Sequence, residues 1–324
     1  MRVVYASDDY YYRYVYISIR TLLESNGSNP DLKITYIEQD VTEEHKALLA
    51  ELGRSFNKEV EIIQFDMPEA FQDLPACNQS KTTFAKFLFA SLFPDDDVVL
   101  FIDPDTLVLR DIAPIFDIGT DDYMFAGVIE NLPAYQRTTV GMAKEDDYIN
   151  GGVVLCNLKK WRECDFEKKV LDYMLEGHHN RNYDQGIINE LCRGQLAILP
   201  PKFSALAEVF DFKDRNKLLR RYGFARYYTQ EEIDEAVQNP VIVHFTHFLY
   251  GKPLNAGCQH PYTQMFLDYL HSSPLDPTLE ADYRDGKMKM RKWFLDHTPF
   301  CVYLAVEALL DSRRRIMLAT GRAK

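Results

Sequence analysis

The feature that most constrains the fold is an apolar run that ends in two aspartates, in the segment VVLFIDPDTLVL. Val98–Ile102 is continuously apolar and follows three aspartates at 95–97, a pattern typical of a buried strand in a parallel sheet. Asp103 and Asp105 come directly after it, and residues i and i+2 of extended backbone point to the same side. Ligands of open α/β sheets bind at the carboxyl ends of strands. The segment therefore predicts two oxygen ligands for a divalent cation that holds a diphosphate.

A D-x-D triplet alone is a weak motif. Asp95 and Asp97 form a second one, which we interpret as a solvated turn. The position after a buried strand is what distinguishes Asp103 and Asp105.

The order of the predicted elements indicates an α/β fold. Strands are expected at 2–6, 33–37, 60–65 and 98–102, and helices between them at 15–23, 42–52 and 82–93. This alternation predicts a Rossmann-like sheet flanked by helices. Further strands are expected at 123–128, 153–158 and 241–244, and helices at 166–176, 185–192 and 261–271. The second half mixes strand directions, so we expect one mixed sheet through residue 271.

The first turn of the chain, Ala6-Ser7-Asp8-Asp9, is acidic, whereas a dinucleotide dehydrogenase has a glycine-rich turn at this point. The sequence therefore disfavours a plain dinucleotide dehydrogenase.

Net charge, cysteine spacing and hydrophobicity exclude several classes of function. The net charge of −12 argues against a general nucleic-acid binder, whose surface would be basic. The six cysteines form no C-x-x-C pair, so we expect reduced thiols in a cytoplasmic protein. Asp8 and Asp9 interrupt any apolar stretch of a signal peptide, and no segment is apolar enough to predict a transmembrane helix.

The C-terminal region differs in charge from the rest. Residues 284–324 hold ten Lys or Arg and four Asp or Glu, a net charge of +6, which leaves −18 on the remainder. We therefore divide the chain into a domain at 1–271 and a basic amphipathic helical tail at 272–324. Basic residues mixed with Trp293, Phe294 and Leu309 suit a segment that lies on anionic lipid. The alternative is a helical pair packed on the main domain or on a second copy of the chain.

Three further polar clusters border apolar segments. Asn150-Gly151-Gly152 precedes an apolar run, where glycines let backbone approach a ligand, although a simple turn explains them equally well. Asp184 and Gln185 open a helix, and there Asp184 is either an N-cap or a receptor of sugar hydroxyls.

His244 ends a short strand and Lys252 follows it. A lone histidine after a strand is usually structural. An imidazole that joins two carboxylates would instead favour Mn²⁺ over Mg²⁺, and a nearby lysine would neutralise phosphate as a point charge.

Five segments in order resemble glycosyltransferase family 8, the retaining nucleotide-sugar transferases of GT-A fold. They run from Val3 to about Tyr269 and read VVYASDDYYYRYVYISIRTLLESN, TTFAKFLFASLFP with VVLFIDPDTLVLRDI, YINGGVVLCNLKKW, NYDQGIIN and VIVHFTHFLYGKP. The family includes bacterial lipopolysaccharide galactosyl- and glucosyltransferases. The resemblance implies a GT-A type mixed sheet and a UDP-sugar donor.

The resemblance also implies roles for individual residues. The implied Mn²⁺ ligands are Asp103, Asp105 and His244. The implied nucleotide-binding residues are Ala6, Asp8, Pro104 and Lys252. The residues implied around the transferred sugar are Lys86, Asn150, Gly151, Asp184 and Gln185. In a front-face reaction Gln185 would lie near the reacting face and Asp184 would orient the sugar; a double displacement with Asp184 as the nucleophile is the alternative.

The phosphate-covering loop departs from the family pattern H-x-x-G-x-x-K-P-W. Lys252 lies eight residues after His244 rather than six, His247 stands where glycine is usual, and Leu254 replaces the tryptophan. The shape of this loop is therefore the part of the site that the resemblance predicts least.

The expected function is Mn²⁺-dependent, retaining transfer of a hexose from UDP-galactose or UDP-glucose to a cell-envelope glycan of lipopolysaccharide type. We expect a cytoplasmic enzyme, peripheral on the inner face of the membrane through its tail, with a homodimer as a further expected assembly. One alternative is a sugar nucleotidyltransferase, which would need a Gly-rich basic loop where Ser7, Asp8 and Asp9 stand. The other is a non-catalytic sugar-binding protein, which the altered loop at 246–251 favours.

Overall fold

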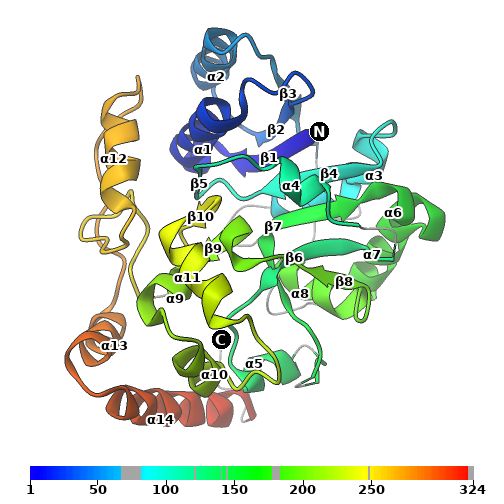
Figure 1. Cartoon of the computed structure of the whole chain (residues 1–324). Helices are drawn as coiled ribbons and strands as arrows, with labels where there is room; N and C mark the ends of the chain where they lie inside the picture. The colour runs from blue at the N-terminus through cyan, green and yellow to red at the C-terminus, as the bar shows by residue number, and fades with distance from the viewer. Residues whose placement is uncertain are drawn as a thin grey trace.

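The computed structural model describes residues 1–66, 82–119, 122–139, 141–143, 145–176, 183–246 and 249–319. Within these ranges a central sheet of seven strands has the order β3-β2-β1-β4-β7-β6-β8 (Figure 1). Its strands are β1 (Arg2–Asp8), β2 (Lys33–Gln39), β3 (Val60–Gln64), β4 (Val98–Ile102), β6 (Phe125–Ile129), β7 (Ile149–Asn157) and β8 (Leu196–Ile198). β3, β2, β1 and β4 are parallel, whereas β7 is antiparallel to both β4 and β6. The predicted α/β fold with mixed strand directions is confirmed.

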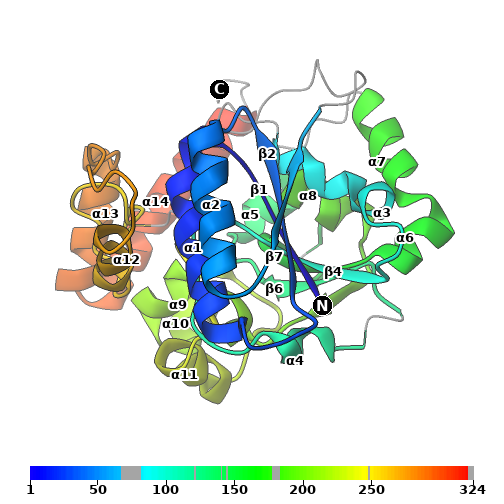
Figure 2. The same ribbon diagram turned by 90° about the horizontal axis from the view of Figure 1, so that it is seen from above.

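Helices cover both faces of this sheet (Figure 2). On the first half of the chain they are η1 (Asp9–Tyr11), α1 (Tyr12–Asn26), α2 (Glu43–Ser55), η3 (Thr82–Leu88), α3 (Phe89–Leu92), α4 (Ala113–Phe116) and α5 (Ala134–Thr139). Alternate residues of β1 explain the two layers. Val3 and Tyr5 pack with α1 in one apolar cluster, whereas Val4 and Ala6 pack with η3 in the other.

The second half of the chain is mostly helical. It contains α6 (Leu158–Cys164), α7 (Phe166–Leu175), α8 (Tyr183–Leu191), η4 (Pro201–Ser204), α9 (Ala207–Phe212), α10 (Arg215–Tyr222), α11 (Gln230–Gln238), α12 (Thr263–His271), α13 (Gly286–His297) and α14 (Phe300–Ala319). None of the described helices is long and apolar enough to cross a membrane. The described cysteines are free, and Cys77 lies outside the described residues.

A small second sheet positions the histidine. It has the order β5-β10-β9, with β5 at Thr106–Val108, β10 at Ile242–His244 and β9 at Ala205–Leu206. β10 runs antiparallel to β5, and His244 is paired with Thr106, the first residue after Asp105. Because of this register, His244 lies close to the residues that follow β4, although it is far from them in the sequence.

Three predictions were wrong. The single sheet expected through residue 271 is two sheets, because β10 pairs with β5 and β9 and not with the central strands. The strand expected at 153–158 begins at Ile149, so Asn150, Gly151 and Gly152 lie inside β7 and the interpretation of them as a simple turn is excluded. Glycines have low strand propensity, so the apolar run alone marked a strand that is shorter than the real one. The helix expected at 82–93 is a 3-10 helix, η3, followed by the single turn α3.

The C-terminal tail is helical, as predicted, and it packs on the body of the protein. Tyr303 of α14 is fully buried against Phe212 and Tyr222. Arg221 of α10 pairs with Glu307 at 2.5 Å and with Asp311 at 2.9 Å. One face of α14 therefore belongs to the folded core, which is what the alternative interpretation of the tail predicted.

Candidate active site

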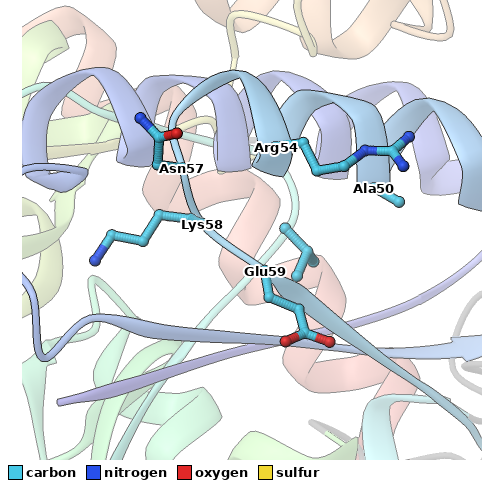
Figure 3. A pocket seen from close by; sticks show the side chains of 6 residues that line it. Ala50, Arg54, Asn57, Lys58 and Glu59 are labelled. Atoms are coloured by element: carbon cyan, nitrogen blue, oxygen red, sulfur yellow. The ribbon is translucent and has the colours of Figure 1, made fainter.

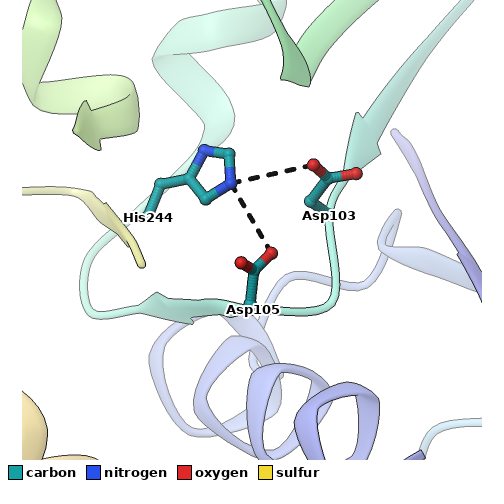
Figure 4. A group of neighbouring side chains, drawn as sticks. All are labelled: Asp103, Asp105 and His244. Carbon is teal, nitrogen blue, oxygen red and sulfur yellow. Dashed lines mark ion pairs between the residues drawn. The ribbon is translucent and has the colours of Figure 1, made fainter. Parts of the chain in front are cut away.

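Two aspartates and a histidine converge at the carboxyl end of β4 (Figure 4). Asp103 follows β4, Asp105 precedes β5, and His244 ends β10. The Nε2 atom of His244 lies 3.7 Å from Oδ2 of Asp103 and 3.6 Å from Oδ1 of Asp105. One ligand atom from each residue lies within 4.8 Å of the others. The expected convergence of these three residues is therefore what the structure shows.

The surroundings of this cluster fit a bound cation. Two carboxylates and an imidazole are a donor set typical of Mn²⁺ and related divalent ions. Gly152 lets the side chains of Asp103 and His244 approach the strand, because a Cβ atom there would lie 2.3 Å from Oδ2 of Asp103 and 2.4 Å from Cε1 of His244. His244 Nδ1 lies 3.4 Å from the hydroxyl of Ser204, so Nε2 is the nitrogen that faces the carboxylates. These residues would hold a divalent ion.

The pKa values of the two carboxylates, Asp103 and Asp105, are shifted in opposite directions. Burial, with Asp105 and Asp184 nearby, raises the pKa of Asp103 despite the opposing effect of Lys86 and His244. Burial also acts to raise the pKa of Asp105, but Lys252 and His244 outweigh it and hold that pKa below its usual value. Asp103 is thus the carboxylate whose charge is least compensated. Such a group favours a cation beside it.

Lys252 joins this cluster from the loop after β10. Its Nζ lies 2.9 Å from Oδ2 of Asp105 and donates to the hydroxyl of Tyr11 at 3.1 Å. Burial disfavours the charged amine, but Asp105 and Tyr11 outweigh this and raise the pKa of Lys252. The lysine is therefore a fixed positive charge next to the candidate metal site, despite the altered spacing of its loop.

A buried ion pair lies behind the cluster. Lys86 of η3 pairs with Asp184 of α8 at 2.5 Å and donates to the carbonyl of Gly151 at 2.9 Å. The Lys86 side chain is 1% exposed and its amine lies 4.1 Å from the centre of the Phe101 ring. Burial opposes the charge, but Asp184 and Asp103 raise the pKa of Lys86. Lys86 therefore fixes the side chain of Asp184 rather than facing open solvent.

Gln185 is bound to the strand that carries the glycines. Its Oε1 accepts from the backbone N–H of Gly151 at 2.9 Å and from Nδ2 of Asn150 at 3.3 Å. Asn150 also donates to Oε2 of Glu130 at 2.6 Å, and its Oδ1 accepts from the N–H of Gly152. The structure therefore brings Asn150, Gly151 and Gln185 together.

The residues expected to bind the nucleotide lie at the same edge of the sheet. Ala6 is buried near the carboxyl end of β1, and Asp8 ends that strand and accepts from the N–H of Tyr11 at 3.3 Å. β1 pairs in parallel with β4, so the carboxyl ends of both strands meet at one edge. Pro104 is buried between the two aspartates. His247 and Asn182 lie outside the described residues.

Sequence reasoning missed two residues at this site, Tyr11 and Glu130. The amine of Lys252 lies 4.8 Å from the centre of the Tyr11 ring. Glu130 accepts a hydrogen bond from Asn150. The run of three tyrosines after Asp9 was a signal for the first. Glu130 stands one residue after a strand, which by itself marks no ligand.

A separate surface pocket lies at the start of β3 (Figure 3). It has a volume of about 530 Å³ and is lined by Ala50, Arg54, Asn57, Lys58, Glu59 and Val60. Its residues come from α2, the loop after it and the first residue of β3, whereas the candidate site follows the carboxyl ends of β1 and β4. Lys58 donates to the carbonyl of Asn29 at 2.5 Å, so its charge is already engaged.

The chain is similar in sequence to known proteins. The model of a family described as glycosyl transferase family 8 matches residues 2–253. General stress protein A of Bacillus subtilis (strain 168) is 24% identical over 278 residues, which are 83% of this chain and 93% of that protein. Lipopolysaccharide 1,2-glucosyltransferase of Escherichia coli (strain K12) is 23% identical over 196 residues, 59% of this chain and 54% of that protein.

The fold is also that of a solved transferase. The crystal structure of the galactosyltransferase LgtC, in complex with donor and acceptor sugar analogues, superposes with a TM-score of 0.71 at 23% identity. The match covers 86% of this chain and 98% of that one. The seven-stranded sheet with its flanking helices is therefore of GT-A type, as predicted.

Proposed function

Since the chain belongs to glycosyltransferase family 8, we propose that it is a retaining hexosyltransferase that uses a UDP-sugar. The donor in this proposal is UDP-galactose or UDP-glucose, and the acceptor is a cell-envelope glycan of lipopolysaccharide type. The similarity to a lipopolysaccharide glucosyltransferase supports this acceptor class.

The observation that carries the proposal is the convergence of Asp103, Asp105 and His244, with Lys252 at 2.9 Å from Asp105. A UDP leaving group gains negative charge as the bond to the sugar breaks. A divalent ion held by these three residues would neutralise that charge, and Mn²⁺ fits the mixed oxygen and nitrogen donors. Lys252 adds a second positive charge for the diphosphate. Ala6, Asp8 and Pro104 border the same edge and are proposed to bind the nucleoside.

The environment of Asp184 favours a front-face reaction. A double displacement would require Asp184 to attack the sugar, but this carboxylate is paired with Lys86 and its side chain is 12% exposed. An ion-paired carboxylate is a poorer nucleophile than a free one. We therefore assign Asp184 the orientation of the transferred sugar, together with Asn150 and Gly151. Gln185 is assigned to the reacting face, and Lys86 supports Asp184.

A screen of donors tests this function. Purified protein with Mn²⁺ is expected to release UDP from one or both of UDP-galactose and UDP-glucose, and to lose this activity with EDTA. A nucleotidyltransferase would instead release pyrophosphate from a nucleoside triphosphate and a sugar phosphate. A non-catalytic sugar-binding protein would bind a sugar but turn over no donor. Either of these two results would contradict the proposal.

We further propose that residues 1–271 form the catalytic domain and that residues 272–324 are a tail that docks on the cytoplasmic face of a membrane. α13 and α14 lie together along one side of the molecule (Figures 1 and 2). The face of this tail that is not packed on the body exposes Met290, Trp293, Leu309, Ile316 and Met317. Exposed Arg313, Arg314 and Arg315 lie on the same helix as Leu309. Apolar side chains beside basic ones suit an anionic lipid surface.

Loss of one exposed apolar side chain is expected to weaken this docking. Leu309→Ala removes a side chain that is 65% exposed, and Leu175→Ala on α7 is the matched control at 59% exposure. We expect Leu309→Ala to lower binding to vesicles with anionic lipid about fivefold, because the variant loses most of the apolar surface that this leucine would bury in the lipid. Cosedimentation with anionic and with neutral vesicles measures this. Equal binding of both variants and the parent would contradict the docking, and a concentration-dependent dimer lost in Leu309→Ala would assign the face to a second copy.

A further inference from the structure

The segment after α12 is bonded to the Lys252 loop through its backbone. The N–H of Glu280 donates to the carbonyl of Leu254 at 2.8 Å, and the N–H of Ala256 donates to the carbonyl of Glu280 at 2.8 Å. Asn255 and Glu280 thus form an isolated parallel bridge. Leu254 is two residues from Lys252, so this bridge holds the carboxyl side of the lysine.

The side chain of Glu280 extends the contact to the start of α1. Its Oε1 lies 2.9 Å from Nη2 of Arg13, and its Oε2 accepts from the hydroxyl of Tyr10 at 2.9 Å. Oε2 also accepts from Nδ2 of Asn255 at 3.2 Å. Glu280 therefore joins the Lys252 loop to the segment that carries Tyr11, the residue against which the amine of Lys252 rests.

Arg284 donates hydrogen bonds to the Lys252 loop as well. Its side chain is 7% exposed, and its guanidinium donates to the carbonyl of Gly257 at 2.5 Å and to the carbonyl of Leu249 at 3.4 Å. Asp282 orients the guanidinium through two oxygens, at 2.9 Å and 3.1 Å. A planar guanidinium held this way links both ends of the loop, before and after Lys252.

A third contact comes from α13. Lys292 pairs with Asp211 at 3.0 Å and its amine lies 4.9 Å from the centre of the Tyr250 ring. Tyr250 is two residues before Lys252. Contacts from 280–292 therefore surround this lysine on both sides along the chain.

We propose that Glu280 and Arg284 are positioning residues that hold the Lys252 loop against Asp105 for diphosphate binding. The role in binding rests on the proposed function. The region matched to the family ends at residue 253, and both positioning residues lie beyond that end. We call the contacts that Glu280 and Arg284 make with the Lys252 loop the brace.

Hydrogen exchange of the metal-free protein tests the brace without any substrate. Arg284→Ala is expected to speed amide exchange about tenfold in peptides that span 249–258, because it removes charged hydrogen bonds to two carbonyls of the loop. Peptides from β1 and β4 are expected to be unchanged. Lys287→Ala, an exposed charge on α13, is the control and is expected to leave the loop at the parent rate. Unchanged exchange in Arg284→Ala would overturn the brace.

Kinetics test the positioning role. Arg284→Ala is expected to raise the KM for the UDP-sugar and the Kd for UDP about tenfold with less than about a twofold change in kcat, because Lys252 is displaced from the diphosphate. Arg284→Lys is expected to recover only part of this affinity. Glu280→Gln keeps the backbone bridge and is expected to raise the same KM and Kd only a few-fold. This second variant tests the positioning role even if Arg284→Ala folds poorly.

These two measurements separate the brace from the proposed function. Faster exchange with parental UDP affinity would overturn the positioning role. A parent chain that bound no UDP would contradict the proposed function, and the exchange rates would still decide whether Arg284 holds the loop.

Discussion

Replacing Asp103 or Asp105 by asparagine is expected to lower the rate of transfer about a thousandfold. Asparagine keeps the size of the side chain but removes a negative ligand, and the cation then loses its hold on the diphosphate. Asp105→Asn also leaves Lys252 without its partner at 2.9 Å. Initial rates of UDP release, measured across a range of Mn²⁺ concentrations, would show the loss.

The second D-x-D triplet provides the matched control. Asp97→Asn makes the same chemical change at a side chain that is 72% exposed and pairs with Arg162 at the surface. Exposed pairs of this kind contribute little to stability. We expect parental activity from Asp97→Asn. Near-parental activity from Asp103→Asn and Asp105→Asn would show that these carboxylates hold no catalytic ion.

Gly152→Ala is expected to abolish binding of the divalent ion without changing any charge. The new methyl group would lie 2.3 Å from Oδ2 of Asp103 and 2.4 Å from Cε1 of His244, so at least one of the two ligands must move. Gly152 itself lies in a buried strand, β7, whose backbone has little freedom to shift away from these two side chains. We expect an activity loss of about a hundredfold or more, since small displacements of positioned groups have effects of this size.

Stability must be measured with activity for this variant. Overpacking a buried site typically costs about 1–3 kcal/mol. We therefore expect Gly152→Ala to melt a few degrees below the parent while losing its affinity for Mn²⁺. Gly119→Ala is the control, because a Cβ there meets no atom within 4 Å. A Gly152→Ala variant that binds Mn²⁺ as the parent does would show that Asp103 and His244, in the positions they hold beside this glycine, are not the ligands of the ion.

The strand and the acidic pair were predictable from sequence because their signal is local. Five consecutive apolar residues and two carboxylates at i and i+2 lie within eight positions. The place of His244 was not predictable from residues alone. It depends on the pairing of β10 with β5, two strands of three residues each, and strands that short leave almost no periodic pattern. The resemblance to a known family supplied what the local pattern did not.

The surface against which the C-terminal tail packs was also not predictable from the sequence alone. Basic and apolar residues alternate along 284–324, and this pattern suits either a lipid surface or a protein surface. The buried pairs of Arg221 with Glu307 and Asp311 decide where one face of α14 lies. Such pairs join residues about 90 positions apart, so no local motif marks them. The brace on Lys252 is likewise formed by contacts that only the folded chain brings together.

The most direct test of the central claim is the affinity for UDP with and without Mn²⁺. Isothermal titration of the parent protein with UDP is expected to show binding in Mn²⁺ that weakens about a hundredfold or more in EDTA, and Asp105→Asn is expected to bind weakly in both. This pattern would follow from a cation held by Asp103, Asp105 and His244 between protein and diphosphate. Equal UDP affinity in Mn²⁺ and in EDTA would contradict the account.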